Sequence, residues 1–228
     1  TEIDLQYSSK DAADIAAALK AGSKNLFSAD STFMYTLTTD VTDTSLLPTK
    51  FNIERTFTEI SKKAAAKDIV VLYLSGHGIN ASGDFYYLTK DAYTANSSAY
   101  IFKEVLQAVG ISSNEFTEYL KKVAALKQLL IIDACASGKI VENLVAHRDI
   151  PYSTLKALDR LKDRTGTHVI TGCAADAVSY EASRFGQGLL TYSLLEGMKG
   201  ASLRDNKFLD VALWFQYARE RVPQLAAG

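Results

Sequence analysis

Two side chains that could act together chemically each follow an apolar run of strand length. The first run, Asp68-Ile-Val-Val-Leu-Tyr-Leu-Ser-Gly-His-Gly78, ends on a histidine between two glycines. The second run, Gln128-Leu-Leu-Ile-Ile-Asp-Ala-Cys-Ala-Ser-Gly138, ends on an acid, a cysteine and small residues. A cysteine becomes nucleophilic as its thiolate, which a neighbouring base favours, and a turn of small residues exposes the sulfur. We therefore predict a cysteine–histidine hydrolase, with Cys135 as nucleophile and His77 as base.

Each of these residue types also has a simpler interpretation. A histidine can lack any catalytic role, as expected for His147 in a polar loop and His168 at the start of a strand. A lone cysteine is commonly a small buried apolar residue, the interpretation favoured for Cys173. Glycine on both sides of His77 is different, because it frees the backbone for close approach to a ligand. His77 and Cys135 lie on separate predicted strands, so they must meet in space.

Predicted strands alternate with predicted helices along the chain. The run Ile69–Leu74 is apolar throughout, which is typical of a strand covered on both faces, as in a parallel sheet. We expect an α/β fold, a three-layer α/β/α sandwich on a mostly parallel central sheet. Further strands are expected at 33–39, 85–88, 128–132 and 167–171. Helices are expected to begin after Ser8, at the N-cap Asn52 and at the capping box of Ser112 and Glu115, and to span 152–164, 188–199 and 209–221. Ligands of such sheets bind beyond the carboxyl ends of the strands, where both motifs fall.

Composition narrows the class of protein. The chain has 228 residues, 47% of them hydrophobic and 22% charged, which indicates one globular domain over residues 1–228. The formal net charge of −1 gives no electrostatic reason to expect nucleic acid or an anionic membrane as partner. No apolar run is long enough to cross a bilayer. Two cysteines make no disulfide framework, so a reducing compartment, the cytoplasm, is expected. The start, Thr1-Glu-Ile-Asp4, shows no signal peptide and no initiator Met, which leaves room for an upstream segment.

The two motifs resemble those of the caspase-like cysteine peptidases, which include caspases, metacaspases, paracaspases and bacterial relatives. The matching blocks are Tyr73-Leu-Ser-Gly-His-Gly78 and Ile132-Asp-Ala-Cys-Ala-Ser-Gly138, and their spacing fits the known signature. Gly186–Gly197 and Tyr217–Pro223 resemble bacterial members. The resemblance implies an endopeptidase acting on protein or peptide substrates by a thiol–imidazole mechanism. It also implies an oxyanion hole formed by the backbone N–H groups of Gly78 and Cys135.

The resemblance also implies a specificity. Caspases have glutamine two places before the cysteine, whereas Asp133 stands here, as in metacaspases and paracaspases, where the acid favours a basic residue before the scissile bond. A partly buried carboxylate is costly unless it receives a cation, and an Arg fork is a good partner. The alternative is that Asp133 only caps the turn. Asp176 matches a second acidic position of the metacaspase pattern, and both acids in one pocket would secure specificity for Arg or Lys.

Three further expectations follow from the resemblance. Relatives are cut on activation in the segment 139–164, which here holds Lys139, Arg148, Arg160 and Arg164, so self-processing is one interpretation and a solvated helix face the other. Family domains open with an apolar strand, and only Ile3–Tyr7 precede the first helix, so that strand is expected upstream. No metal or other cofactor is predicted, because no His/Cys cluster has zinc spacing and no Ca²⁺-loop pattern occurs. Since some metacaspases need Ca²⁺, calcium dependence stays open.

Three functions therefore compete. The first is an endopeptidase that cleaves after Arg or Lys. The second is a catalytically silent relative that works as an interaction or signalling module, joined to other domains or subunits. The third is an unrelated α/β protein with incidental motifs, which a structure with His77 far from Cys135 would favour.

Overall fold

The computed structural model describes residues 5–24, 26–81, 84–92, 99–100, 102–136, 168–171, 181–182 and 185–227. The chain forms two compact units, one made of residues 1–36 and 179–228 and the other of residues 37–178. The second unit contains both chemical motifs of the sequence.

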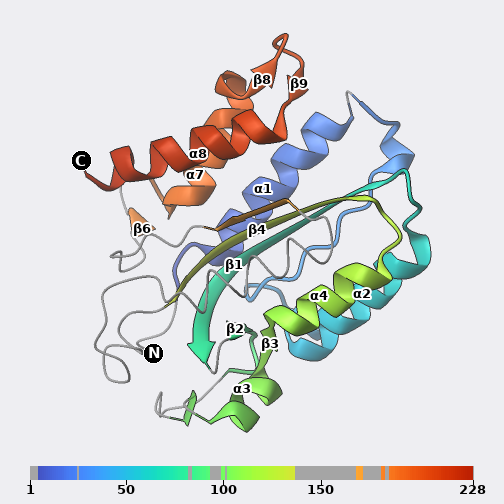
Figure 1. Cartoon of the computed structure of the whole chain (residues 1–228), viewed down its shortest axis with the longest axis vertical. Coiled ribbons are helices and arrows are strands. Elements are labelled where there is room, and N and C mark those ends of the chain that lie inside the picture. The colour runs from blue at the N-terminus through green and yellow to red at the C-terminus, as the bar shows by residue number, and fades with distance from the viewer. Residues whose placement is uncertain are drawn as a thin grey trace. The chain divides into compact units, whose positions relative to one another are not determined.

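The second unit is built on a five-stranded sheet with the strand order β3-β2-β1-β4-β5 (Figure 1). Its strands are β1 (Ile69–Ala81), β2 (Asp84–Leu88), β3 (Gly110–Ser112), β4 (Lys127–Ala136) and β5 (His168–Thr171). The strands β1, β4 and β5 are parallel, and β2 and β3 extend the sheet as an antiparallel meander. The predicted α/β class with a parallel core is confirmed.

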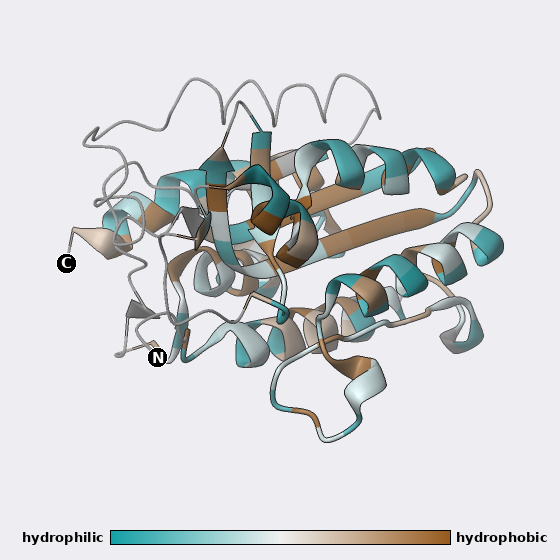
Figure 2. Cartoon of the chain, turned by 90° about the horizontal axis from the view of Figure 1, so that it is seen from below, coloured by the Kyte–Doolittle hydropathy of each residue, from teal (hydrophilic) through white to brown (hydrophobic). Residues whose placement is uncertain are grey.

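Two helices, α2 (Lys50–Lys63) and α4 (Ser113–Lys122), lie side by side on one face of this sheet (Figure 1). Their apolar side chains pack on alternate residues of the strands. The buried cluster comprises Ile53, Phe57, Leu74, Phe85, Tyr87, Ile111, Phe116, Leu120, Val123, Ala125, Leu130, Ile132 and Ala134. Figure 2 shows the two long strands coloured as hydrophobic along most of their length, in keeping with this burial.

Local signals set the ends of these helices, although not all as predicted. The capping box of Ser112 and Glu115 is confirmed, because each side chain accepts a hydrogen bond from the other's backbone N–H. Helix α2 begins earlier than predicted, since its N-cap is Thr49 and not Asn52. The amide of Asn52 instead donates to the carbonyl oxygens of Thr44 and Leu47, each at 2.9 Å, and so ties the preceding 3₁₀ turn η2 (Thr44–Leu46) to the helix.

A lysine joins the first turns of α2 and α4 and the end of the short helix α3 (Lys103–Val109). The ammonium of Lys50 donates to Glu115 Oε1 at 2.6 Å and to the carbonyl oxygens of Gln107 and Gly110. Glu115 also accepts from the backbone N–H and the hydroxyl of Ser112 through its other oxygen. This network holds the two helices together at one end.

The strands differ from prediction in two places. Residues 33–39, predicted as a strand, form none, because β-rich composition alone does not supply a partner strand. The sequence also indicates a Gly/Asn/Ser-rich loop from Gly76 onward, but β1 continues through Gly76-His77-Gly78 to Ala81 and pairs with β2. The histidine therefore lies inside a strand and not in a loop.

The first unit is mainly helical. Its elements are α1 (Ser8–Ser23), the 3₁₀ turn η1 (Ala29–Ser31), β6 (Glu181–Ala182), β7 (Gln187–Gly188), α7 (Leu189–Glu196), the short π-helix η4 (Gly197–Ala201), β8 (Leu203–Arg204), β9 (Phe208–Leu209) and α8 (Val211–Ala226). Helices α7 and α8 are joined by the indole of Trp214, which donates to the carbonyl oxygen of Leu194 at 2.8 Å, and by Tyr217 and Arg221, which both donate to Glu196.

The last helix is longer than expected from the sequence. The last helix, expected over 209–221, continues past Pro223 to Ala226, and the N–H of Ala227 still donates to the carbonyl oxygen of Pro223. A proline removes its own N–H donor and leaves its carbonyl available, so one more turn can form. Of the helices that the structure describes, none combines the length and hydropathy needed to cross a membrane.

Candidate active site

The pairing of β1 with β4 brings the two sequence motifs together. The strands are in parallel register over ten pairs, from Ile69 opposite Lys127 to Gly78 opposite Ala136. His77 and Cys135, 58 positions apart in the chain, are direct partners in this ladder. Neighbouring strands lie about 4.8 Å apart, so the two backbones are adjacent at this point. The interpretation that depended on a large separation, an unrelated protein with incidental motifs, loses its basis.

The alternation of strand side chains decides which face of the sheet each residue occupies. Leu74 on β1 and Ile132 and Ala134 on β4 belong to the cluster under α2 and α4. His77 and Asp133 are odd-numbered on the same strands, so they face the opposite side of the sheet, and both are half-buried there. Asp133 stands opposite Ser75, one step of the alternation before the His77–Cys135 pair.

Part of the predicted site lies outside the residues that the structure describes. The side chain of Cys135, the acid Asp176 and the whole segment 139–164 are outside the described part of the chain. The predicted roles of these residues stay predictions. Gly78, the other predicted oxyanion residue, is buried and stands opposite Ala136 on β4 and Tyr87 on β2.

The two glycines around His77 make room for aromatic rings of β2. A Cβ atom on Gly76 would lie 2.9 Å from the hydroxyl oxygen of Tyr87, and one on Gly78 would lie 2.3 Å from Cε2 of Phe85. Both distances are too short for real Cβ contacts, so side chains larger than hydrogen do not fit while the rings stay in place. The sequence suggests that these glycines allow close approach of a ligand, and the structure adds that they make room for Phe85 and Tyr87 on the face opposite His77.

Tyr87 also holds the strand by a hydrogen bond. Its hydroxyl donates to the carbonyl oxygen of Ser75 at 2.9 Å. The ring is buried, and this burial raises the pKa of Tyr87 to about 12, so the phenol remains a protonated donor at any ordinary pH. On its other side the ring meets Phe116 of α4 edge-on, with 6.4 Å between ring centroids. Tyr87 thus links α4 to the tip of β1.

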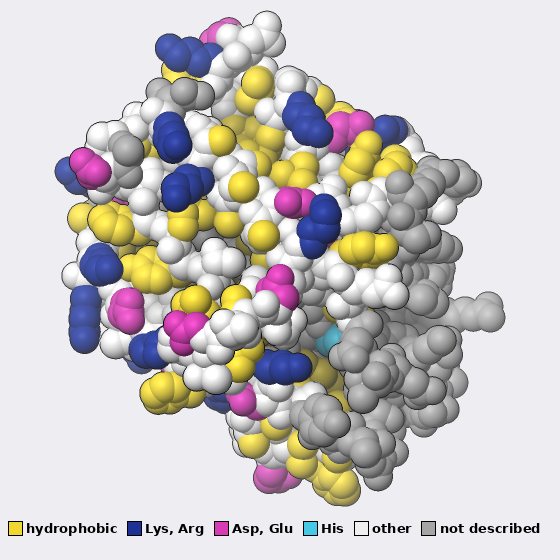
Figure 3. All heavy atoms as spheres, turned by 180° about the vertical axis from the view of Figure 1, so that it is seen from behind, with side chains coloured by type: hydrophobic (Ala, Val, Ile, Leu, Met, Phe, Trp, Pro, Cys, Tyr) yellow, Lys and Arg dark blue, Asp and Glu magenta, His cyan; other side chains and the backbone are white. Residues whose placement is uncertain are grey.

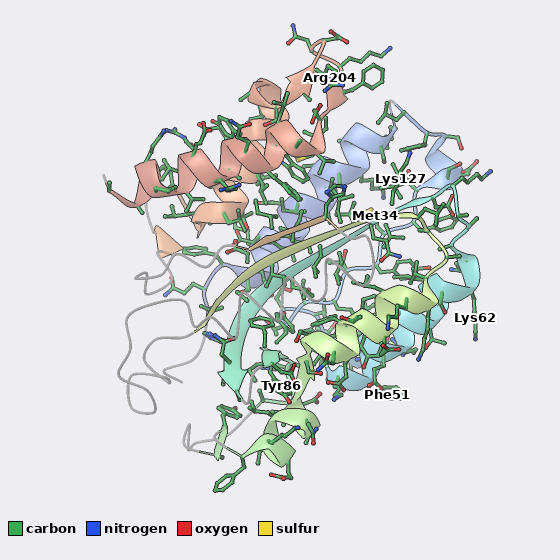
Figure 4. The ribbon with its side chains drawn as sticks, in the orientation of Figure 1. Met34, Phe51, Lys62, Tyr86, Lys127 and Arg204 are labelled. Atoms are coloured by element: carbon green, nitrogen blue, oxygen red, sulfur yellow. The ribbon has the colours of Figure 1, made fainter. Side chains whose placement is uncertain are left out.

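Sequence reasoning recognised Phe85-Tyr-Tyr-Leu88 as a strand but assigned it no part in the site. The signal was available, because Phe85 and Tyr87 are two residues apart, as are Gly76 and Gly78, so each pair falls on one face of its strand. Tyr86, labelled in Figure 4 on β2, lies between the two and belongs to the other face. What the sequence lacked was the hairpin register that sets the two pairs against each other.

The described surroundings offer no evident metal centre. Among the described residues, no group of three or more His, Cys, Asp or Glu side chains could hold a metal ion. On the face drawn in Figure 3, cationic and anionic side chains are interspersed with hydrophobic ones and form no large patch of a single sign.

Comparisons with known proteins give one match. The family model described as the caspase domain matches residues 1–226 of the chain. A search of curated proteins found no match. The family match spans both compact units and includes the His77 and Cys135 positions, and it confirms the caspase-like fold class.

Proposed function

We propose that this chain, which belongs to the caspase domain family, is a cysteine endopeptidase that uses Cys135 as nucleophile and His77 as acid/base group. The family is one of cysteine-type peptidases, whose substrates are proteins or peptides. The observation that carries the assignment to these two residues is their direct pairing across β1 and β4.

The proposed reaction follows from the chemistry of the pair. His77 accepts the thiol proton of Cys135, and the thiolate attacks the carbonyl carbon of the scissile peptide bond. His77 then gives the proton to the leaving amine, and water hydrolyses the acyl-enzyme. The backbone N–H groups of Gly78 and Cys135 are the proposed donors to the oxyanion, each worth about 2.7–4 kcal/mol in comparable sites.

We further propose that Asp133 selects a basic residue before the scissile bond. Support comes from its position, because it shares a sheet face with His77 and is half-buried beside Ser75. A carboxylate that is partly withdrawn from water favours a cationic partner, and a guanidinium can bind it in bidentate fashion. Asp176 is proposed as a second acid of the same pocket, on the sequence pattern alone.

Self-processing within 139–164 follows from the same specificity, since this segment carries six Lys and Arg residues after which such an enzyme could cut. The proposed chemistry needs no cofactor, and it needs a reduced thiol, as in the cytoplasm. Addition of a chelator therefore leaves the activity unchanged, and a loss of activity that added Ca²⁺ restores would reveal calcium dependence. Other domains or subunits of a larger signalling protein remain proposed partners.

The test is a panel of short peptides that differ only in the residue before the scissile bond. Cleavage after Arg and Lys is expected, and Cys135→Ala and His77→Gln should each lower kcat by roughly 10⁴-fold or more. Asp133→Asn should raise KM for Arg peptides more than for neutral ones. Cleavage after Asp but not Arg would remove the specificity proposal.

The competing interpretation, a silent interaction module, needs a separate measurement. An alkylating peptide analogue with Arg at the reactive end should label Cys135 in the wild-type chain, and His77→Gln should slow labelling strongly because the thiolate loses its base. A thiol that resists labelling in the wild-type chain, in a protein that still binds a partner, would favour the silent module.

A further inference from the structure

The tip of β1 has little of its own to fix its shape. His77 sits between two glycines, and glycine has the widest choice of backbone conformations of all residues. A catalytic group gains most when its geometry is fixed before the reaction, and a small misplacement can cost a large factor in rate. Something outside the tip must therefore restrain it.

One restraint is the ladder with β4, which includes His77 itself, and a second comes from β2. Tyr87 stands opposite Gly78 in the antiparallel hairpin, and its ring extends over Gly76, with the hydroxyl bonded to the carbonyl oxygen of Ser75. Phe85 stands opposite Asn80, and its ring lies over Gly78. The two rings fill the places that side chains at 76 and 78 would take.

We propose that Tyr87, together with Phe85, is a positioning residue that fixes the imidazole of His77 by clamping the strand on both sides of it from the opposite face of the sheet. The proposal rests on the proposed function of His77. The clamp acts through the backbone, because the rings lie over the glycines before and after His77, on the face of the sheet opposite its side chain. It is backed by α4, since Phe116 packs against the ring of Tyr87.

The clamp explains why a buried ring at position 87 also carries a hydroxyl bonded to Ser75, which packing alone does not require. A buried tyrosine hydroxyl needs a hydrogen-bond partner, and many backbone carbonyls could serve. Here the buried hydroxyl of Tyr87 donates to the carbonyl oxygen of Ser75, two positions before His77. The strand becomes glycine-rich at this point. A phenylalanine would fill the same space without that bond.

The test compares Tyr87→Phe with a control tyrosine of the same core. Tyr119 on α4 contacts Phe57 and Phe116, and its hydroxyl donates to Glu54 at 2.7 Å, so Tyr119→Phe removes a similar bond away from the tip. With an Arg peptide as substrate, Tyr87→Phe is expected to lower kcat about tenfold with KM unchanged. Tyr119→Phe is expected to leave kcat within about twofold.

A second readout does not depend on activity. The chain has three histidines, so the imidazole signals can be resolved by NMR, and the signal that disappears in His77→Gln belongs to His77. Tyr87→Phe should shift or broaden this signal, and Phe85→Leu should disturb it in the same way with the hydroxyl intact. Tyr119→Phe should leave it in place.

The outcomes separate the clamp from the proposed function. An unchanged His77 signal in both Tyr87→Phe and Phe85→Leu, or equal losses of kcat in Tyr87→Phe and Tyr119→Phe, would overturn the clamp. A wild-type chain that cleaves no peptide, while Tyr87→Phe still displaces the His77 signal, would overturn the peptidase and leave the clamp standing.

Discussion

The strands β1 and β4 have similar sequences and very different surroundings. Both carry an apolar run that leads to a chemically useful residue, and they lie side by side in register. In β4, Leu129–Ile132 are all buried, with exposed fractions of 7% or less. In β1, Val70–Tyr73 are only half-buried, and Ile69 is 47% exposed. A continuous apolar run thus does not by itself guarantee a buried strand.

The difference follows from the number of neighbouring strands. Leu129–Ile132 of β4 pair with β1 on one side and with β5 on the other. Within the described residues, β1 pairs with β2 only from Gly78 to Ala81, and the rest of its ladder is with β4. β1 is therefore paired with both neighbouring strands at Gly78, directly after His77, and with β4 alone along its apolar run.

The largest effect is expected from a matched pair of leucines. Leu72 of β1 and Leu130 of β4 are direct partners on the face under α2 and α4. Leu130→Ala should lower the free energy of unfolding by about 2–5 kcal/mol, because Leu130 is fully buried and leaves a cavity. Leu72→Ala should cost about 1–2 kcal/mol, because part of its side chain already contacts water. Urea unfolding measures both.

Equal losses of unfolding free energy in Leu130→Ala and Leu72→Ala would contradict the difference in burial between β1 and β4. They would mean that the half-buried run of β1 is covered in solution as fully as that of β4. The slope of the unfolding free energy against urea should be the same for both variants, since neither changes the surface exposed on unfolding by much.

Local signals made part of this architecture predictable. The capping box at Ser112 and Glu115 depends on residues three positions apart, and it formed as expected. The two apolar runs were correctly identified as strands, because an unbroken run of apolar residues is also a local signal. Asn52 was wrongly given the cap, because Thr49 and Asn52 are both good cap residues and the contact of Asn52 with η2 is not encoded in the helix itself.

The sequence proposes residues for the candidate site but does not give their geometry. Motif spacing pointed to His77 and Cys135, but their pairing depends on strand order, which links positions 58 residues apart and leaves no local trace. The sequence singled out the glycines beside His77, but only the hairpin register reveals that the rings of Phe85 and Tyr87 occupy the space that side chains at 76 and 78 would take. Asp133 stands opposite Ser75 on the strand that carries Cys135, and its role in specificity stays a prediction.

The second prediction concerns why β1 has glycine where β4 has alanine. Gly76 and Gly78 are the register partners of Ala134 and Ala136. Gly78→Ala should lower the free energy of unfolding by about 1–3 kcal/mol, because its Cβ would meet the ring of Phe85 at 2.3 Å. Phe85→Leu should relieve this, so that the double variant loses less than the sum of the single losses.

The control for that cycle is Gly22 of α1, where a Cβ would meet nothing within 4 Å. Gly22→Ala should be neutral or slightly stabilising, since alanine restricts the unfolded chain and helices favour it. Purely additive losses for Gly78→Ala and Phe85→Leu would show that ring and glycine do not compete for the same space.

The smallest predicted effect tests the support that α2 and α4 give to β1. Burial tends to raise the pKa of Glu115, but hydrogen bonds from Lys50 and Ser112 outweigh it and hold this pKa below the ordinary 4.5. A lowered pKa in the folded state gives stability that is present above the unfolded pKa and is lost as the pH falls through the folded pKa.

Glu115→Gln should therefore reduce the free energy of unfolding by about 1 kcal/mol at pH 7, a modest value because the side chain is about one-third exposed. The difference in unfolding free energy between wild type and Glu115→Gln should narrow as the pH falls below 4.5 and through the lowered pKa of folded Glu115. Glu118→Gln on the same helix, at a side chain 59% exposed, is the control and should change little at either pH. Urea unfolding at pH 7 and pH 3.5 gives the four differences, and a gap for Glu115→Gln that does not depend on pH would contradict the lowered pKa.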